Sequence, residues 1–318
     1  MKLPTFKIDV AKLVTNPIFV SLAAMLCCAL WGSATPVIKL GYEHLLPVRD
    51  TASTILFAGI RFFFSGIITV VLFSIARRTF LVPKRKNLGK VVTVSLFQTI
   101  IQYILFYVGL ANTSGVKATI LSGSSAFFAM LFSTLLFKME KIDAKKIIGC
   151  LLGFVGIIVV NLNGLDLSVD LLGDGFCLLS AVSVAMSSTL TKIFSKDEDP
   201  VTISGYQFIF GGAVMVIIGL SFGGQISFES GTGIGILIYL AFLSAVAYSL
   251  WGILLKHNSV SKVTIFSFTT PVFGVLLTEL LLREDSKTGI VNLILALVFV
   301  CAGILFLNYQ KRTKENKT

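Results

Sequence analysis

The sequence predicts an all-α integral membrane protein in which ten transmembrane helices form two inverted repeats of five helices each. Three observations support this fold class: the composition of the chain, the positions of its basic residues, and a similarity between two segments 144 positions apart. Hydrophobic residues make up 55% of the chain and charged residues only 14%, whereas about 25% of a soluble domain is charged. This composition is typical of a protein embedded in a lipid bilayer.

Long apolar runs lie between clusters of charged residues along the whole chain. A transmembrane helix needs about 20 predominantly apolar residues to cross a hydrocarbon core of about 30 Å. The ten predicted spans cover residues 18–38, 51–76, 91–111, 116–137, 144–162, 171–193, 201–220, 231–255, 259–281 and 287–309.

The basic residues predict the orientation of these spans. With the N-terminus in the cytoplasm, 21 of the 27 Lys and Arg residues fall on the cytoplasmic side, five fall outside, and Arg61 lies within a span. Cytoplasmic loops normally carry such an excess of Lys and Arg. We therefore expect a multi-pass protein of a bacterial-type plasma membrane with both termini in the cytoplasm. Nucleic acid is not an expected partner, because the basic residues are dispersed between apolar runs and do not form one patch.

The internal similarity predicts the relation between the two halves. The segment STLLFKME (133–140) resembles LTELLLRE (277–284), and each ends a long apolar run with a basic residue and a glutamate. Five spans in the first half mean that the second half enters the bilayer from the opposite side, which places Glu140 and Glu284 at opposite surfaces. The predicted organisation is a cytoplasmic segment (1–17), a first five-helix repeat (18–162), a second five-helix repeat (163–309) and a cytoplasmic tail (310–318).

The chain lacks the usual signs of a membrane-embedded enzyme. Paired carboxylates, a metal-ligand set or an activated nucleophile would be needed near the hydrocarbon region. His44 and His257 fall at opposite faces in the predicted topology, and HExxH, GxSxG and Walker motifs are absent from the sequence. The cysteines fall within spans and are interpreted as small apolar residues. The sequence therefore predicts no catalytic residue, no metal site, no cofactor and no direct use of ATP.

Arg61 is the most informative polar residue inside a span. It lies about ten residues into the second predicted span, near the bilayer midplane, where a charged side chain costs several kcal/mol unless it is paired. One interpretation is a contact to a substrate carboxylate. The other is a structural arginine that donates to backbone carbonyls of broken helices.

The third and eighth spans carry aromatic and amide side chains. Gln98 and Gln102 lie one turn apart, with Tyr103 and Tyr107 on an adjoining stripe, which favours a cavity lining, although hydrogen bonds between helices are the alternative. Trp251 occupies the position equivalent to Tyr107 in the second half. Together with Tyr248, it predicts a second aromatic stripe facing the first. Anchoring at the membrane interface is the alternative for this pair.

Two further candidate binding residues lie in the sixth and seventh spans. Ser183 belongs to a helix face of hydroxyl residues, and Gln207 precedes a pair of glycines. Packing of small residues between helices explains both patterns equally well.

Pro36, Gly123 and Pro271 are the candidate hinges. Prolines and glycines inside spans favour discontinuous helices, which expose amides and carbonyls to a substrate. Gly123 belongs to the segment SGSS (122–125), which precedes Phe127 at the position equivalent to Pro271. Such residues are also ordinary in transmembrane helices.

The segments LCCALWGSATPVIKL and FAGIRFFFSGI, together with the paired glutamates, resemble the drug/metabolite transporter superfamily, and in particular its ten-helix EamA-like branch. The resemblance covers residues from about 20 to 309 and implies two five-helix halves around a central cavity. Residues that match the family pattern are Trp31, Gly32, Pro36, Arg61, Glu140, Pro271 and Glu284. Trp31 is therefore added to the candidate substrate-binding residues, whereas Phe127 departs from the proline common at its position.

The resemblance implies a secondary transporter that moves a small polar metabolite by alternating access. An amino acid is the leading expectation for the substrate, and export is the expected direction. Organic anions or sugar conjugates are the alternative, favoured by Arg61, Lys117 and the aromatic stripes. A channel is disfavoured because nothing indicates a symmetric ring of filter ligands. The expected partners are a small-molecule substrate and the lipid bilayer, and a homodimer is compatible with this architecture.

Overall fold

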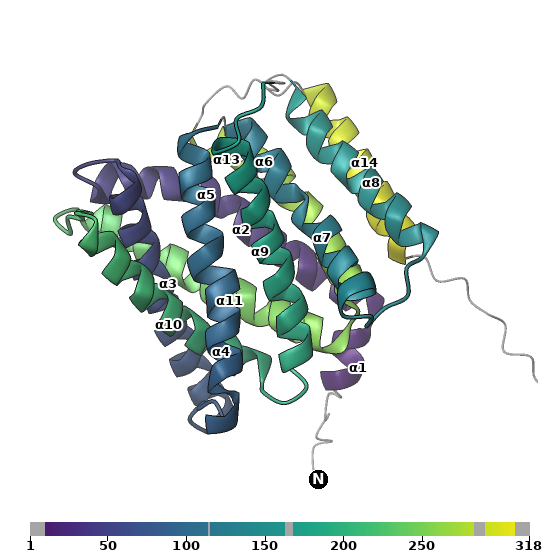
Figure 1. Ribbon diagram of the computed structural model, residues 1–318, viewed down its shortest axis with the longest axis horizontal. Helices are drawn as coiled ribbons and strands as arrows, with labels where there is room; N and C mark the ends of the chain where they lie inside the picture. The colour runs from purple at the N-terminus through teal and green to yellow at the C-terminus, as the bar shows by residue number, and fades with distance from the viewer. Residues whose placement is uncertain (1–9, 114, 163–167, 283–289, 309–318) are drawn as a thin grey trace, which may run out of the picture.

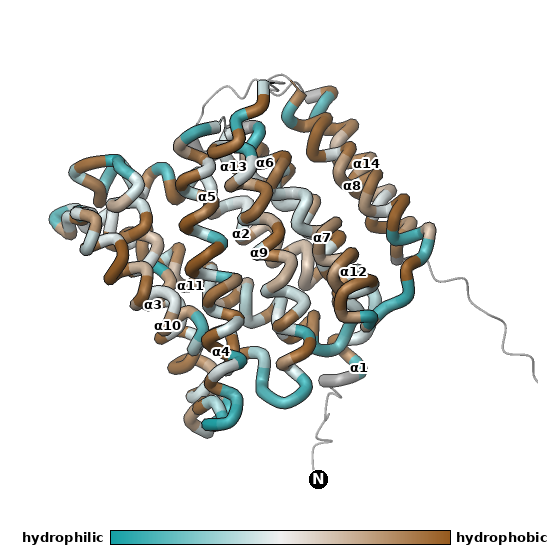
Figure 2. The backbone as a smooth tube through the Cα atoms, in the orientation of Figure 1, coloured by the Kyte–Doolittle hydropathy of each residue, from teal (hydrophilic) through white to brown (hydrophobic). Residues whose placement is uncertain are grey.

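The computed structural model describes residues 10–113, 115–162, 168–282 and 290–308, and these residues form helices and connecting segments without any strand (Figure 1). The predicted all-α fold class is therefore confirmed for the described part of the chain. Apolar residues dominate the helical rods and polar residues concentrate at their ends (Figure 2). The first nine residues, the tail from residue 309 and Glu284 lie outside the described residues.

Helices occupy each of the predicted apolar stretches. In the first half these are α1 (Val10–Thr15), α2 (Pro17–Leu45), α3 (Thr51–Arg77), the 3-10 turn η1 (Arg85–Asn87), α4 (Leu88–Ser95), the π-helical η2 (Leu96–Ile101), α5 (Gln102–Ala111), α6 (Gly115–Gly123), α7 (Ser125–Leu131), the π-helical η3 (Phe132–Leu136) and α8 (Ala144–Val160). In the second half these are α9 (Gly173–Phe194), α10 (Pro200–Ser221), α11 (Gly231–His257), α12 (Val260–Thr264), the 3-10 helix η5 (Ile265–Thr269), α13 (Thr270–Leu282) and α14 (Ile290–Asn308).

Eight helical stretches among the described residues are long and apolar enough to cross a membrane. Two predicted spans fall short of that length: α8 has 17 residues, and the described apolar part of α14 is Val291–Leu307. These two helices pack side by side at one edge of the molecule (Figure 1). The crossing of the bilayer by all ten stretches, and the inverted relation of the halves, stay predictions.

Short polar signals fix where several helices begin. The Asn16 side chain accepts hydrogen bonds from the first turn of α2, the Asp50 side chain accepts one from Ser53 N–H at 2.7 Å, and Asp199 accepts one from Thr202 N–H at 3.0 Å. Such side chains satisfy N–H groups that have no partner within the helix. The helix ends therefore follow from local sequence.

Glycines allow α3 and α10 to pack in direct contact. A Cβ atom placed on Gly212 would lie 2.4 Å from Phe63 N, and one placed on Gly66 would lie 2.5 Å from Gly205 O. Small residues bring the backbones of membrane helices close together in this way. This contact holds Arg61, on α3, against the second half of the chain.

Two irregular segments shape the interior, and they correspond only in part to the predicted hinges. The α6 helix ends at Gly123, so that the fourth predicted span is broken there. In the ninth span, the 3-10 helix η5 changes to α13 immediately before Pro271. In contrast, α2 continues without interruption through Pro36, so the expectation of a discontinuous helix at that proline is wrong for this structure.

Candidate functional site

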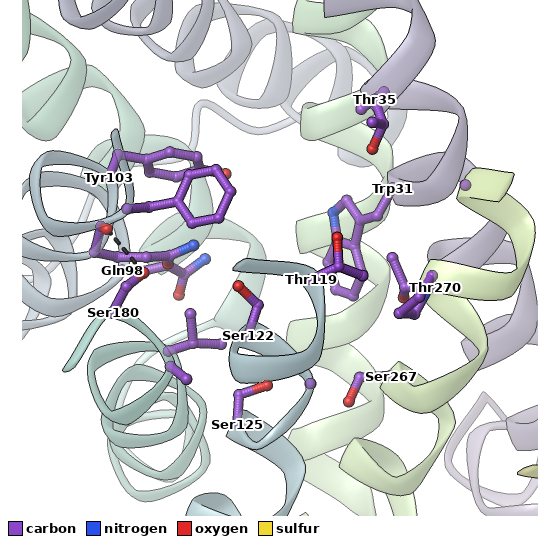
Figure 3. A pocket seen from close by; sticks show the side chains of 18 of the residues that line it. Trp31, Thr35, Gln98, Tyr103, Thr119, Ser122, Ser125, Ser180, Ser267 and Thr270 are labelled. Carbon is purple, nitrogen blue, oxygen red and sulfur yellow. Dashed lines mark hydrogen bonds between the residues drawn. The ribbon is translucent and has the colours of Figure 1, made fainter. Parts of the chain in front are cut away.

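A cavity of about 660 Å³ lies in the interior, between helices of the two halves (Figure 3). The structure brings most of the candidate residues to this cavity. The predicted residues that line it are Trp31, Arg61, Gln98, Gln102, Tyr103, Tyr107, Gly123, Tyr248, Trp251 and Pro271. Their spacing in the sequence predicted a polar and aromatic lining, and the geometry places them around one space.

Ser183, Gln207 and Pro36 do not belong to the cavity wall. The Ser183 hydroxyl donates to Phe97 O at 2.6 Å, and the fully buried Gln207 side chain accepts from the Thr99 hydroxyl at 2.7 Å. Pro36 is buried in α2. Hydrogen bonding and packing between helices, the alternative interpretation for Ser183 and Gln207, therefore describes where these side chains lie.

The two aromatic stripes meet inside the cavity. The hydroxyls of Tyr103 and Tyr248 lie 3.3 Å apart, which joins α5 to α11. The Trp31 ring lies 5.1 Å from the Tyr248 ring and 4.9 Å from the Trp251 ring, measured between centroids. Tilted and edge-to-face contacts of this kind are favourable between aromatic rings. The aromatic wall is thus one continuous surface contributed by α2, α5 and α11.

Arg61 lies in this aromatic environment and is almost completely buried, with 4% of its surface exposed. The guanidinium carbon lies 4.2 Å from the Phe62 ring centroid and 5.9 Å from that of Tyr103. Its Nε atom is buried without a hydrogen-bond partner in the described structure. Arg61 nevertheless belongs to the residues that line the cavity.

Further lining residues were not anticipated from the sequence. They are Thr35, Lys39 and Tyr42 on α2, Thr119, Ser122 and Ser125 around the break after α6, and Ser267 and Thr270 around η5. In Figure 3 the side chains of Thr35, Trp31 and Thr270 lie across the cavity from Tyr103 and Gln98. Trp31, Thr35, Ile38 and Tyr42 follow helical spacing along α2, and this pattern was the signal that could have identified them.

Among the described residues that line the cavity, the exposed ones lie toward one end. Lys39, Leu110 and Gly115 line it near one face of the bundle and are exposed. At the opposite end the lining residues Thr191, Leu255 and Thr264 are only 5%, 1% and 4% exposed. The structure therefore has a cavity that is open toward one face and closed toward the other.

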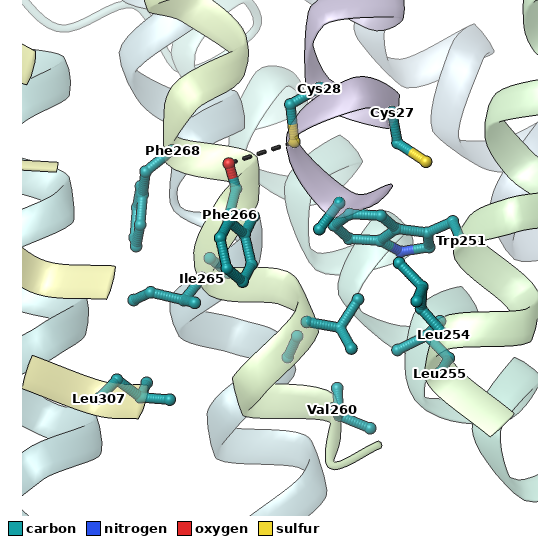
Figure 4. Close-up of a cluster of buried hydrophobic side chains, with 14 of the residues drawn as sticks. Cys27, Cys28, Trp251, Leu254, Leu255, Val260, Ile265, Phe266, Phe268 and Leu307 are labelled. Carbon is teal, nitrogen blue, oxygen red and sulfur yellow. Dashed lines mark hydrogen bonds between the residues drawn. The ribbon is translucent and has the colours of Figure 1, made fainter. Parts of the chain in front are cut away.

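A cluster of buried apolar side chains fills the closed end (Figure 4). It includes Leu254, Leu255, Val260 and Phe266, all 1% exposed or less. The Cys28 thiol donates to Phe266 O at 3.2 Å and so joins α2 to η5 within this cluster. This cysteine packs as a small buried residue, as predicted.

Glu140 joins the two halves beyond this cluster. Its Oε1 atom accepts hydrogen bonds from the backbone N–H groups of Val260, at 2.5 Å, and Ser261, at 3.3 Å. Its Oε2 atom accepts from the Ser261 hydroxyl at 2.7 Å and forms an ion pair with Lys146 at 2.8 Å. A carboxylate with several charge-assisted hydrogen bonds is held firmly. Glu140 therefore fixes the end of the fourth stretch against the first turn of α12.

The charged residues among the described lining of the cavity are all basic. Lys39 and Arg61 are its basic residues, and no Asp, Glu or His occurs among the described residues that line it. The described part of the chain also contains no group of three or more His, Cys, Asp and Glu residues arranged to hold a metal. The chemistry of the site is thus that of hydrogen bonding, aromatic contact and positive charge.

The sequence profile of the EamA-like transporter family matches residues 18–162 and again residues 171–309. The chain belongs to the EamA-like transporter family. These proteins are multi-pass membrane transporters, in agreement with the apolar helices described above.

Related EamA-like proteins come from bacteria and archaea. An uncharacterized transporter of Archaeoglobus fulgidus is 23% identical to this chain, and the alignment covers 80% of this chain and 87% of the relative. The uncharacterized transporter YetK of Bacillus subtilis is 26% identical, with 84% of this chain and 80% of the relative covered. A probable amino-acid metabolite efflux pump of Salmonella typhimurium is 27% identical, with 82% of this chain and 86% of the relative covered.

A solved crystal structure of another protein has the same fold. The two structures superpose with a TM-score of 0.75, and the superposition includes 91% of this chain and 96% of the other chain. At 16% sequence identity, this similarity concerns the fold alone.

Proposed function

We propose that this EamA-like protein is a secondary transporter that moves a small polar metabolite by alternating access, with an amino acid as the leading substrate. The observation that carries the proposal is the interior cavity, which both halves line and which is open toward one face and closed toward the other. Alternating access requires a site that communicates with one side at a time. A continuous pore would be open at both ends.

Two lines of support favour an amino acid. A relative that is 27% identical is described as a probable amino-acid metabolite efflux pump. The cavity also offers a buried positive charge, aromatic faces and neutral hydrogen-bonding groups, which suit a carboxylate and the rest of a small polar molecule. Export is the expected direction in the predicted topology.

Organic anions or sugar conjugates are the second candidate. The observation that favours them is the presence of Arg61 and Lys39 with no acidic residue among the described lining. A ligand with a net negative charge would complement this cavity.

For the membrane and the topology, the proposal follows the sequence predictions. We place the protein in a bacterial-type plasma membrane, as ten spans in two inverted five-helix repeats with both termini in the cytoplasm. The family profile supports this organisation because it matches the chain twice.

Counterflow in proteoliposomes tests the proposal. Vesicles loaded with one unlabelled metabolite are placed in trace amounts of the same labelled metabolite, for each standard amino acid and for a set of monocarboxylates without an amine. A carrier accumulates label transiently because internal substrate stimulates its entry. Conductive flux without this stimulation would indicate a channel, and no flux with any compound would reject the proposed substrates.

A further inference from the structure

Arg61 carries a positive charge that no acidic residue among the described lining of the cavity neutralises. No hydrogen bond or ion pair joins its guanidinium group to any residue in the described part of the chain, and its Nε atom is buried without a partner. A buried charge is costly unless a counter-charge or a set of hydrogen bonds compensates it.

The structural alternative for Arg61 lacks support. A structural arginine in a membrane protein would donate to carbonyl oxygens of neighbouring helices, and the buried Nε atom of Arg61 forms no such bond with the described residues. The ring of Phe62, 4.2 Å from the guanidinium carbon, stabilises the cation. An aromatic ring supplies no oxygen acceptor, so the guanidinium N–H donors still need a partner.

Tyrosine side chains line the cavity together with Arg61; they are Tyr42, Tyr103, Tyr107 and Tyr248. The centroid of the Tyr103 ring lies 5.9 Å from the guanidinium carbon, and the Tyr103 hydroxyl lies 3.3 Å from that of Tyr248. Phenolic O–H groups donate hydrogen bonds but supply no counter-charge. The missing component of this cluster is an anion that can accept several hydrogen bonds.

We infer that Arg61 and the tyrosine hydroxyls around it form a carboxylate subsite, so that the transported molecule is recognised through its carboxylate. The inference rests on the proposed transport function. A guanidinium fork and a carboxylate are complementary in geometry, and two parallel N–H···O bonds would neutralise the buried charge.

The opposite wall defines the rest of the substrate. Trp31, Ser122, Ser267 and Thr270 present an indole ring and neutral hydroxyl side chains, and Lys39 lies at the open end. One buried cation therefore faces a wall without charge. The substrate is a monocarboxylate whose remaining part is neutral or is an amine held on aromatic faces, and dicarboxylates are disfavoured.

The experiment compares acids with their amides in the full-length protein. The probes are the standard amino acids and simple monocarboxylates in counterflow, and, for each acid that is exchanged, its carboxamide. Wild type should prefer the acid by about tenfold or more, because a charge-assisted contact is lost with the amide. Arg61→Lys keeps the charge but loses the planar fork, so its apparent affinity should fall for the acid and stay the same for the amide. Arg61→Gln should remove the preference.

Arg77→Gln is the matched control, since it removes the same charge from the same helix, at a residue that pairs with Asp199 and does not line the cavity. It should retain the preference for the acid. Wild type that exchanges an amide as readily as its acid would overturn the inference while leaving the transport function in place. Equal loss of acid and amide in Arg61→Lys, together with a lowered melting temperature, would also overturn it and assign Arg61 to the scaffold.

A binding measurement is independent of transport. Acetate, compared with acetamide at equal ionic strength, should raise the melting temperature of detergent-purified wild type but not that of Arg61→Gln, because a ligand that binds only the folded state stabilises it. Equal shifts in the two proteins would reject the subsite even if no compound were transported. Absence of transport with an Arg61-dependent acetate effect would reject the proposed function and keep the subsite.

Discussion

Glu140 and Ser261 lie 121 positions apart in the sequence and are joined by a hydrogen bond of 2.7 Å between their side chains. Glu140 follows the last stretch of helix before α8, and Ser261 lies in the first turn of α12, so this bond connects the two halves of the chain. It lies beyond the apolar cluster that closes the cavity. We interpret it as a latch of the closed end.

Removal of this latch should open the closed end of the cavity. In a cysteine-free protein with Thr264→Cys as reporter, Glu140→Ala should raise the rate of labelling from the Glu140 side by about tenfold or more, because several charge-assisted hydrogen bonds are lost. Thr264 suits this purpose because it lines the closed end and is 4% exposed. The measurement uses an impermeant thiol reagent applied to oriented vesicles.

Glu198→Ala is the control for that experiment. Glu198 is a buried carboxylate that accepts hydrogen bonds from Lys84 N–H and the Asn87 side chain, both at 2.9 Å, away from the cavity wall. Its removal should leave the labelling of the reporter unchanged. Equal labelling in both variants would show that Glu140 is not a latch.

The contact between α3 and α10 should not tolerate a methyl group. Gly212→Ala would place a Cβ atom 2.4 Å from Phe63 N, and backbone atoms cannot move aside as a flexible side chain can. The expected loss of unfolding free energy is about 1–3 kcal/mol or more, as for overpacked cores. Gly235→Ala, with no atom within 4 Å of the new Cβ, should be neutral in the same melting measurement in detergent. Similar melting of both variants would contradict the packing described.

The predicted topology can be tested at the two ends of α9. Val169 is 80% exposed before α9, whereas Lys86 is exposed beside the segment that contacts Asp197 after α9. In a cysteine-free background, Val169→Cys should react with an impermeant thiol reagent added outside intact cells, and Lys86→Cys should react only after the cells are opened. The reverse pattern would invert the orientation predicted from the basic residues.

Transport should depend only weakly on a proton gradient. Proton coupling requires a titratable group that becomes accessible from each side in turn, and no Asp, Glu or His occurs among the described residues of the cavity wall. An imposed pH gradient should therefore produce little accumulation of substrate in proteoliposomes. Glu279, whose side chain lies outside the described part of the chain, follows the lining residue Thr278 in the sequence. Strong accumulation that Glu279→Gln abolishes would disprove this prediction.

The sequence predicted those features that the bilayer imposes directly. Long apolar runs must be helical, because backbone groups cannot remain unpaired in hydrocarbon. The spacing of Gln98, Gln102, Tyr103 and Tyr107 placed polar groups on one region of a helix, and these residues do line the cavity. Whether they bind substrate stays a prediction.

The faces of individual helices could not be predicted in the same way. Gln98 and Gln207 are both amides in apolar stretches, yet one lines the cavity and the other is buried against Thr99. Gln98 lies within the π-helical turn at Leu96–Ile101, where side chains depart from α-helical spacing, and Gln207 on α10 packs against the same segment through Thr99. Tyr42 lies beyond the first predicted span (18–38), where a tyrosine is usually an interfacial anchor, so its helical spacing from Trp31 was the one signal that pointed to the cavity.

The pairing of Trp31 with Trp251 has an optical consequence. These are the two tryptophans of the chain, and their rings lie 4.9 Å apart in the cavity wall. All tryptophan fluorescence of the protein therefore originates at the site where a substrate would displace water. We expect the emission of the unmodified protein to change when a substrate occupies the cavity, without an attached dye and without a background from tryptophans elsewhere.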